Sequence, residues 1–254
     1  DKESPTQIAK MLCTMDYSDS PMSILECMNG DREKRTDAVA KDDIGDDFQN
    51  LNTVAVQCVA NADLQPLSRS PGLPDDAFEH DGTITKREVR AITLAALAPL
   101  PGDVLWDIGA GNGTIAIEWL RVEPRAHALA FEKDSVRADR ICANAAALGV
   151  PALQVVAKHF PPAPNGIEPK PDAIFIGGGL ASDDDLIATC LKTLKPGGRV
   201  VANAVTLEAQ ARLMTAHAVH GGELVRIAIA RADAVGTLQA MKSSIDVLQW
   251  RVTV

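Results

Sequence analysis

Aromatic side chains are scarce in this chain: they make up 4% of its 254 residues, and there is a single tyrosine. A core must therefore be built mainly from aliphatic residues, and the abundant Ala and Val suit an α/β protein. No apolar run reaches the roughly 18 residues that a membrane span needs, and no basic-then-apolar leader opens the chain. The sequence thus predicts no membrane association. Because it begins with Asp1 and not with Met, we expect a fragment or a processed product.

Cysteine pairs with a metal-binding or redox spacing are also absent. The five cysteines stand far apart, at Cys13, Cys27, Cys58, Cys142 and Cys190. We therefore expect buried free thiols in a cytoplasmic protein and no metal site. Basic charge is in deficit as well: a net charge of −9 repels a phosphate backbone, which disfavours nucleic acid as a partner.

A proline-rich segment divides the chain. Residues 64–78 carry three prolines, a glycine and little periodicity, which is typical of a linker. We place a boundary near residue 70 and expect domains at 1–70 and 71–254. In the first, 5–15 and 21–30 have helix-like spacing, 31–48 is charged and exposed, and 52–60 suits a buried strand. So thin a core indicates an incomplete domain.

After the boundary, strands and helices alternate. Strands are predicted at 103–108, 126–132, 152–157, 171–179 and 199–205, with further ones at 223–231 and 245–254. Helices are predicted at 85–100, from Gly113, at 135–149 with Asp134 as cap, after a cap at Ser182, and at 206–219. This alternation indicates right-handed crossovers and a mainly parallel sheet, and the continuous apolar runs fit strands covered on both faces.

The most informative stretch follows the first of these strands. Asp107 lies near the end of the strand, and alternating glycines at 109, 111 and 113 then lead into a helix. Missing side chains allow positive φ and let a ligand lie on the backbone, while free N–H groups at a helix start favour negative groups. In an open parallel sheet, ligands bind at this edge. Glu132, at the end of the next strand, can accept hydrogen bonds from both hydroxyls of a ribose.

Two cofactors suit this geometry. A dinucleotide places its pyrophosphate on a G-x-G-x-x-G loop, but the spacing here is G-x-G-x-G and Asp107 would repel a pyrophosphate. S-adenosylmethionine carries an ammonium, a sulfonium and a carboxylate, so its carboxylate can meet the loop N–H groups while Asp107 helps to place the cation. Glu132 suits either cofactor. A NAD-dependent oxidoreductase is therefore the weaker hypothesis, and a non-catalytic nucleotide-binding module that kept the loop is a third.

Four separated stretches carry a family resemblance: 72–91 (GLPDDAFEHDGTITKREVRA), 107–119 (DIGAGNGTIAIEW), 174–180 (IFIGGGL) and 194–208 (LKPGGRVVANAVTLE). They resemble the class I S-adenosylmethionine-dependent methyltransferases. More narrowly, they resemble the C-terminal C15-methyltransferase domain of the precorrin-6Y C5,15-methyltransferase (decarboxylating) family of cobalamin (vitamin B12) biosynthesis. The resemblance covers about residues 72–254 and implies a Rossmann-like α/β fold with a seven-stranded, mainly parallel sheet.

Residues 4–64 are more loosely similar to the C-terminal half of a tetrapyrrole methylase domain, the part of the family that methylates C5. Its cofactor loop would precede residue 1, so we expect no C5 methylation from this chain. Related C15 domains often assemble as tetramers. The resemblance therefore implies a homo-oligomer such as a tetramer, with Trp250 of the last strand as a candidate interface residue.

The resemblance also implies site residues. The cofactor-binding set would comprise Thr85, Asp107, Gly109, Ala110, Gly111, Asn112, Gly113 and Glu132, with His159 and Phe160 flanking the adenine. Family members often have a small acidic turn at the last two positions, from which this sequence departs. The substrate would be a polycarboxylate precorrin, bound by Lys86, Arg90, Gly177, Gly178, Gly179 and Asn203. No catalytic residue is identified, and the candidates are Lys86, Arg87, Asn203 and Thr206.

The implied reaction methylates C15 of the ring and removes CO2 from the C12 acetate. The nucleophilic carbon is already electron-rich, so positioning supplies much of the acceleration and no strong base is needed. Purely structural roles are the alternative for these residues. Lys86, Arg87 and Arg90 fit a solvated helix face, and Thr206 fits a helix cap. A class I methyltransferase acting on another small molecule is the alternative activity.

Overall fold

The computed structural model describes residues 1–160 and 166–254 and divides into two compact units, Asp1–Leu67 and Ser68–Val254. The division falls within the proline-rich segment, next to the boundary expected near residue 70. No helix among the described residues is long and apolar enough to cross a membrane.

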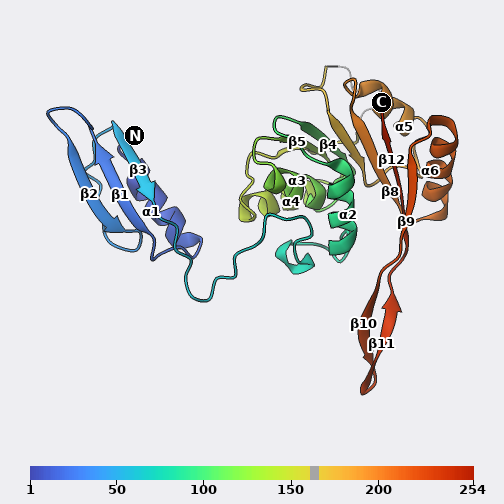
Figure 1. The fold of residues 1–254 in the computed structure, drawn as a ribbon, viewed down its shortest axis with the longest axis horizontal. Helices are drawn as coiled ribbons and strands as arrows, with labels where there is room; N and C mark the ends of the chain where they lie inside the picture. Colours follow the sequence, from blue (N-terminus) through green and yellow to red (C-terminus); the bar gives the residue numbers. More distant parts are fainter. Residues whose placement is uncertain (161–165) are drawn as a thin grey trace. The chain divides into compact units, whose positions relative to one another are not determined.

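The Asp1–Leu67 unit is a small antiparallel sheet with one helix (Figure 1). Its strands lie in the order β2-β1-β3, and its elements are α1 (Ser4–Thr14), β1 (Pro21–Glu26), β2 (Lys34–Val39) and β3 (Asn52–Val56). The helix expected at 21–30 is wrong. Met22 and Ile24 are buried two residues apart, which is the period of a strand, and they form part of the unit's thin core. The charged segment also contributes the edge strand β2.

The Ser68–Val254 unit is a three-layer α/β domain. From its start to residue 204, its elements are η1 (Asp75–Ala77), α2 (Arg87–Leu97), β4 (Val104–Ile108), α3 (Thr114–Val122), β5 (His127–Phe131), α4 (Ser135–Ala147), β6 (Gln154–Val156), β7 (Ala173–Ile176), α5 (Leu186–Thr193) and β8 (Arg199–Ala204). They are followed by α6 (Leu207–His220), β9 (Glu223–Ile227), β10 (Ala230–Val235), β11 (Leu238–Ser243) and β12 (Val247–Thr253).

Seven strands form one sheet in the order β6-β5-β4-β7-β8-β12-β9. The pairs from β6 to β8 are parallel, whereas β12 is antiparallel to both β8 and β9. The expected seven-stranded, mainly parallel sheet is confirmed. The chain moves outward from β4 to β6 and then returns to β7 on the other side of β4. This reversal places a topological switch point between β4 and β7, where ligands bind in such sheets.

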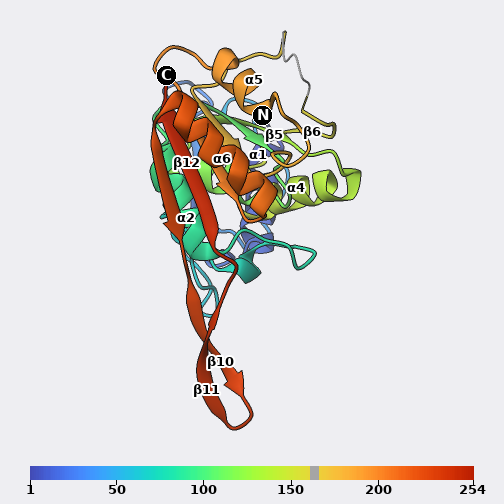
Figure 2. The same cartoon turned by 90° about the vertical axis from the view of Figure 1, so that its right-hand side faces the viewer.

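Helices cover both faces of this sheet. Leu94 and Leu97 of α2 pack with α3 and α4 in one apolar cluster, and Leu186 and Leu213 of α5 and α6 pack in the other. Figure 2 shows α6 lying along the sheet beside β12. All residues of β4 and β7 are buried, as expected of central parallel strands. Both strands therefore hold their carboxyl ends rigidly in place.

A hairpin was missed by the sequence analysis. The strand predicted at 223–231 is in fact β9, which joins the sheet, followed by β10, which turns at Gly236 into β11 (Figure 1). Every residue of β10 and β11 is exposed, and the pair forms a two-stranded sheet of its own. No buried face gives these strands a hydrophobic pattern to read, so periodicity could not find them.

Local predictions fared unevenly. Asp134 caps α4 and Thr206 caps α6, as expected. Ser182 is not a cap, because α5 begins after Asp185 and the Ser182 hydroxyl donates to Gly179 O at 3.1 Å. Of the five cysteines, Cys190 alone is buried, so the expectation of buried thiols is wrong for the others.

The three tryptophans, Trp106, Trp119 and Trp250, have no exposed surface. Trp250 packs against α6 and donates its indole N–H to Gly221 O at 2.9 Å. It therefore belongs to the core of the unit and is not an exposed interface residue.

Candidate functional site

Two glycine stretches meet at the carboxyl edge of β4 and β7. The N–H of Gly177 donates to Ile108 O at 2.9 Å. A Cβ on Gly109 would lie 2.8 Å from both the Cα and the N of Gly178, and Gly109 has a φ of +70°. Both the close approach and the backbone conformation therefore require glycine at position 109.

Asp107 is a buried acid just before this loop, 1% exposed. Its Oδ2 accepts a hydrogen bond from Ala116 N–H at 3.1 Å, in the first turn of α3. Its Oδ1 is buried and has no hydrogen-bond partner among the described residues. Burial raises the pKa of this carboxyl to about 7, the Ala116 hydrogen bond opposes the shift, and the charge of Glu132 adds to it. Such an orphaned buried oxygen is unusual and suits a cationic ligand nearby.

Glu132 follows β5 and binds the glycine loop. Its Oε2 accepts from Gly111 N–H at 2.8 Å, and its Oε1 accepts from Asp134 N–H at 3.0 Å. The residue is 6% exposed. A Cβ built on Gly111 would meet nothing within 4 Å. The loop thus fixes the carboxylate while leaving open space beside it.

A cavity of about 240 Å³ opens where these groups meet. Eight of the residues predicted to bind cofactor or substrate border it: Gly109, Gly111, Glu132, His159, Phe160, Gly177, Gly178 and Gly179. Phe160 is buried beneath it, with its ring centroid 5.1 Å from that of Phe131 and 6.0 Å from that of Trp106. The exposed His159 has its Nδ1 2.8 Å from the carbonyl oxygen of Phe160.

Three residues of the predicted loop do not border the cavity: Ala110, Asn112 and Gly113. The N–H of Gly113 donates to Ala110 O at 2.8 Å, which tightens the turn into α3. A Cβ on Gly113 would lie 2.7 Å from the side chain of Ile141, so this glycine serves the packing of α3 on α4. Asp107 also lies behind the loop and outside the cavity lining.

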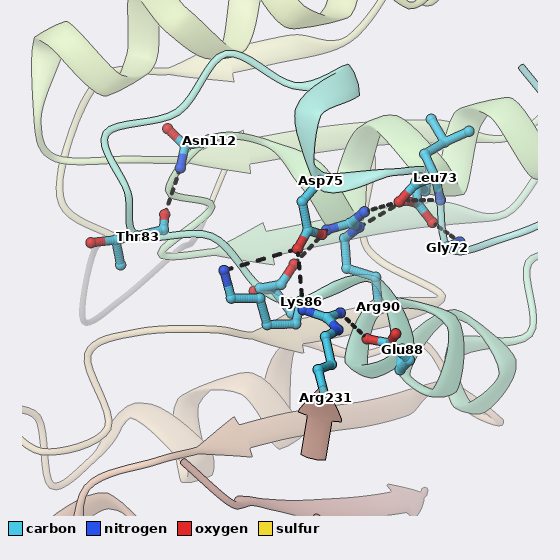
Figure 3. Close-up of polar contacts among 11 residues, drawn as sticks. Gly72, Leu73, Asp75, Thr83, Lys86, Glu88, Arg90, Asn112 and Arg231 are labelled. Carbon is cyan, nitrogen blue, oxygen red and sulfur yellow. Dashed lines mark hydrogen bonds and ion pairs between the residues drawn. The ribbon is translucent and has the colours of Figure 1, made fainter. Parts of the chain in front are cut away.

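Residues 72–86 form a segment, here called the strap, that is bonded to the loop and to the helices behind it (Figure 3). Thr85 lies near its end, and its carbonyl oxygen accepts from Arg90. Asn112 donates its Nδ2 to Thr83 O at 2.7 Å. The side chain of Asn112, expected to bind cofactor, thus points to the strap (Figure 3).

Arg90 does not lie where a substrate-binding residue would. It has no exposed surface, and its guanidinium donates to Glu118 at 2.8 Å and to Asp75 at 2.7 Å. The sequence placed it on a solvated or substrate-facing helix surface, but it faces the interior between α2, α3 and the strap. Its neighbours remain accessible: the Lys86 side chain is 41% exposed, 3.9 Å from Asp75, and Arg87 is exposed.

Asn203 and Thr206 lie at the end of β8. Asn203 is half-buried and donates its Nδ2 to Thr93 Oγ1 at 2.9 Å, and its Oδ1 accepts from Gln249 Nε2 at 2.9 Å. Thr206 is exposed and its hydroxyl oxygen accepts from Ala209 N–H at 3.3 Å as the cap of α6. Both side chains thus have structural partners.

The sequence analysis missed several residues of the site. Lys133, Arg137, Lys158 and Asp183 border the cavity, and Glu118, Arg140 and Asn144 hold the strap or the loop. One signal was available: Glu118 interrupts the apolar face of a helix, which is where a buried acid needs a partner.

A larger hollow of about 350 Å³ lies at the amino ends of β5 and β6, lined by apolar side chains and by Arg69 and Arg121. It lies at the edge of the sheet opposite the glycine loop, so the smaller cavity is the better ligand site. In residues 1–160 and 166–254, no group of three or more His, Cys, Asp or Glu side chains could hold a metal ion.

Comparison with known proteins gives concordant matches. A family profile described as "Precorrin methyltransferase domain" matches residues 76–254. A precorrin-6Y C(5,15)-methyltransferase (decarboxylating) of Sinorhizobium sp is 43% identical over 253 residues, covering 100% of this chain. The chain spans 61% of the length of that relative.

Two further matches cover less of the chain. A Saccharolobus solfataricus protein named "Probable cobalt-precorrin-6B C(15)-methyltransferase (decarboxylating)" is 37% identical over 142 residues, covering 54% of this chain and 71% of its own length. The crystal structure of the C-terminal domain of precorrin-6Y C5,15-methyltransferase from Rhodobacter capsulatus has a TM-score of 0.69 and 42% identity. It covers 74% of this chain and is itself covered completely.

Proposed function

Because the chain belongs to the precorrin methyltransferase domain family, we propose that its Ser68–Val254 unit is an S-adenosylmethionine-dependent C-methyltransferase of cobalamin biosynthesis. Its substrate is a precorrin tetrapyrrole, which it methylates at C15 while the C12 acetate side chain loses CO2. The observation that carries the proposal is the cavity at the glycine loop, with Glu132 at its rim and the orphaned oxygen of Asp107 behind it.

The residues present fit this cofactor, which supplies a methyl group on a positively charged sulfur. Glu132 is an acceptor placed for a pair of ribose hydroxyls. The buried Asp107 carboxyl has one oxygen without a hydrogen-bond partner among the described residues, which a cationic ligand can satisfy. Gly109 and Gly111 border the cavity without side chains, and the open space beside Gly111 lets a ligand lie against the backbone. A dinucleotide fits less well, because the loop has the spacing G-x-G-x-G and not the G-x-G-x-x-G that holds a pyrophosphate.

The chain's own contribution to the reaction is binding and orientation. Gly177, Gly178 and Gly179 keep one wall of the cavity free of side chains, which leaves room for a flat macrocycle at its mouth. Lys86 and Arg87, exposed where the strap enters α2, are proposed to bind carboxylates of the substrate. Holding the acceptor carbon and the acetate in a fixed position at the cavity lowers the entropic part of the activation barrier.

The decisive experiment incubates the chain with S-adenosylmethionine and a precorrin that lacks the C15 methyl group. Mass spectrometry should show the gain of one methyl group in place of a hydrogen, together with the loss of CO2. Cofactor binding without any change in the substrate mass would contradict the proposed activity and favour a non-catalytic binding module. Tight binding of NAD in place of S-adenosylmethionine would contradict the cofactor assignment.

Substrate recognition is tested separately by the Lys86→Ala, Arg87→Ala double variant. We expect a raised KM for the precorrin with an unchanged Kd for S-adenosylmethionine, because the two side chains lie outside the cofactor cavity. Arg125→Gln, which removes an exposed cation from the loop after α3, is the matched control. An unchanged KM in the double variant would reassign Lys86 and Arg87 to a solvated helix face.

We further propose that the protein is a homo-oligomer such as a tetramer, held together by β10 and β11. These strands are fully exposed and carry apolar side chains, with Val235 62%, Leu238 75% and Met241 68% exposed. An isolated two-stranded ribbon is marginally stable and leaves both of its edges unpaired. A second copy of the same hairpin can satisfy those edges and cover the apolar side chains.

The Asp1–Leu67 unit is proposed to be part of a tetrapyrrole methylase domain, as its looser resemblance implies. A cytoplasmic location is supported by the five free cysteines, because reducing compartments keep thiols unpaired.

A further inference from the structure

The strap is bonded along its length to the helices behind it. At its start, the N–H groups of Gly72 and Leu73 donate to the Glu118 carboxylate of α3 at 2.6 and 3.1 Å. In its middle, Asn144 of α4 accepts from Glu79 N–H at 2.8 Å and donates to Glu79 O at 3.0 Å. The strap is therefore a fixed element of the unit, although it contains little regular secondary structure.

Arg90 fixes the two ends of the strap together. Its guanidinium pairs with Glu118 and Asp75, and it donates to the carbonyl oxygens of Leu73 and Thr85 (Figure 3). Glu118 is 1% exposed, so this is a buried ion pair whose remaining donors are used on backbone. The planar fork of five N–H groups serves these four partners at once, which a lysine ammonium cannot do.

Asn112 joins the strap to the glycine loop. Its Nδ2 donates to Thr83 O at 2.7 Å, and its Oδ1 accepts from Arg140 Nη1 of α4 at 3.0 Å. The residue is 4% exposed and stands between Gly111 and Gly113, whose φ angles are +61° and +77°. Glycine backbone has little stiffness of its own, so this part of the loop depends on its hydrogen bonds. The side-chain bonds of Asn112 add to those of Gly111 N–H to Glu132 and of Asn144 Nδ2 to Asn112 O.

We infer that Asn112 and Arg90 are positioning residues for the cofactor, an inference that rests on the proposed function. Arg90 fixes the strap, and Asn112 clamps the glycine loop to the strap on one side and to α4 on the other. The loop backbone is then arranged before the cofactor arrives, so less order has to be created on binding. Neither side chain borders the cavity, and both act through the backbone that they hold.

The test measures binding of S-adenosylhomocysteine and S-adenosylmethionine to the full chain by calorimetry, together with the melting temperature. Asn112→Ala removes both side-chain bonds of the clamp without touching the cavity lining. We expect affinity for both ligands to fall about tenfold, because a loosened loop must be ordered on binding. In turnover, the KM for S-adenosylmethionine should rise by about the same factor while kcat at saturating cofactor stays within about twofold.

Two further variants isolate the clamp. Arg140→Gln removes one of the two side-chain bonds of Asn112, together with the long ion pairs of Arg140 to Glu79 and Asp81 at 3.8 and 3.6 Å. Such ion pairs near the surface contribute little, so its loss of affinity should be smaller than that of Asn112→Ala. The Asn112→Ala, Arg140→Gln double variant should bind about as well as Asn112→Ala alone, because both changes break one bridge. Arg125→Gln removes a positive charge from an exposed site and should leave binding unchanged. Arg90→Lys keeps the charge but not the fork, and it should weaken binding together with thermal stability.

The outcomes separate this inference from the proposed function. A wild-type chain that binds neither ligand contradicts the proposed function itself. A wild-type chain that binds, beside an Asn112→Ala variant of equal affinity and lower melting temperature, overturns the inference, because Asn112 then only stabilises the fold. Additive losses in the double variant overturn it as well. If Arg90→Lys does not fold, the Asn112 and Arg140 variants still decide.

Discussion

Gly109 and Gly178 lie backbone against backbone at the carboxyl edge of the sheet. A Cβ on Gly109 would approach both the Cα and the N of Gly178 to 2.8 Å, a distance that real Cβ atoms do not reach. The two glycine stretches, which the sequence analysis assigned to cofactor and substrate separately, therefore form one structure. Any change that separates them alters both walls of the cavity at once.

Gly109→Ala should accordingly be far more damaging than an alanine at another left-handed glycine. Gly102 is the matched control, because its φ is +85° and a Cβ there would meet nothing within 4 Å. Gly102→Ala should lower the free energy of unfolding by about 1–2 kcal/mol through backbone strain alone. Gly109→Ala should lose roughly 1–3 kcal/mol more from crowding. Urea denaturation of both variants measures the difference, and equal losses would contradict the close approach.

Glu132→Gln is expected to weaken S-adenosylmethionine binding strongly. The amide keeps the size of the side chain but loses the charge and one of the two acceptor oxygens, and its NH2 group must face either Gly111 N–H or Asp134 N–H. Hydrogen bonds to a charged group contribute roughly 1.5–3 kcal/mol, so Kd should rise by at least about tenfold. Calorimetry measures this, with the exposed Glu223→Gln as control. Similar affinities for the two variants would remove Glu132 from the site.

Asp107 should give the ligand-free protein a distinctive pH dependence. Its folded pKa of about 7 lies above the ordinary aspartate value of 3.8. The folded state then holds an extra proton between about pH 4 and pH 7, so the stability that this group contributes falls as pH rises through that window and is lost above it. Asp107→Asn lacks this loss, and its stability relative to wild type should rise between pH 4 and 7, by a few kcal/mol at about 1.4 kcal/mol per unit. Urea titrations at several pH values measure the difference. A difference that is constant with pH would show that the buried carboxyl has an ordinary pKa.

Asn203→Ala should destabilise the unit whatever its role in turnover. Thr93 and Gln249 are 0% and 1% exposed, and both hydrogen-bond the amide of Asn203. Removing that amide leaves buried polar groups short of partners, at roughly 1–3 kcal/mol. Denaturation measures this loss, and kcat/KM for the precorrin shows whether Asn203 also acts on substrate. Unchanged stability would mean that water replaces the amide and that the hydrogen bonds among Thr93, Asn203 and Gln249 do not stabilise the fold.

Leu238→Glu, combined with Met241→Glu, should reduce the assembly to smaller species. Both side chains are exposed on β11, and charges there would be buried unpaired between copies of the hairpin. Sedimentation velocity should show a lower mass with an unchanged circular dichroism spectrum. Val219→Glu on α6, also 69% exposed, is the control for added charge. An unchanged mass in the hairpin variant would place the subunit contact elsewhere.

The sheet was predictable because its central strands are covered on both faces. Ala173–Ile176 reads as an unbroken apolar run, and Asp134 and Thr206 mark helix starts with side chains that do cap them. β1 was mistaken because its two buried apolar residues are too few to distinguish a period of 2 from one of 3.6. β10 and β11 bury nothing, so they leave no periodic signal at all.

The candidate site was predictable in its backbone and less so in its side chains. Glycine spacing and the strand-end acids located the cavity, because both follow from local chain geometry. The environment of Arg90 did not follow, because its partners Asp75 and Glu118 lie 15 and 28 residues away along the chain. Arg90 follows Lys86 and Arg87 at the start of a helix, and three cations in that position suggest a solvent-exposed helix face. Tertiary packing decides which of the three is buried.

The uneven distribution of tryptophan and tyrosine between the two units gives each unit its own intrinsic fluorophore. Trp106, Trp119 and Trp250 all belong to the Ser68–Val254 unit, and Tyr17 of the other unit is the one tyrosine of the chain. Indole emission therefore follows the melting of one unit alone, whereas far-ultraviolet dichroism follows both. Trp106 packs edge-on to Phe131, which borders the cavity, with ring centroids 5.5 Å apart. Ligand binding in the cavity should thus shift the wavelength of the tryptophan emission maximum, without any added dye or tag.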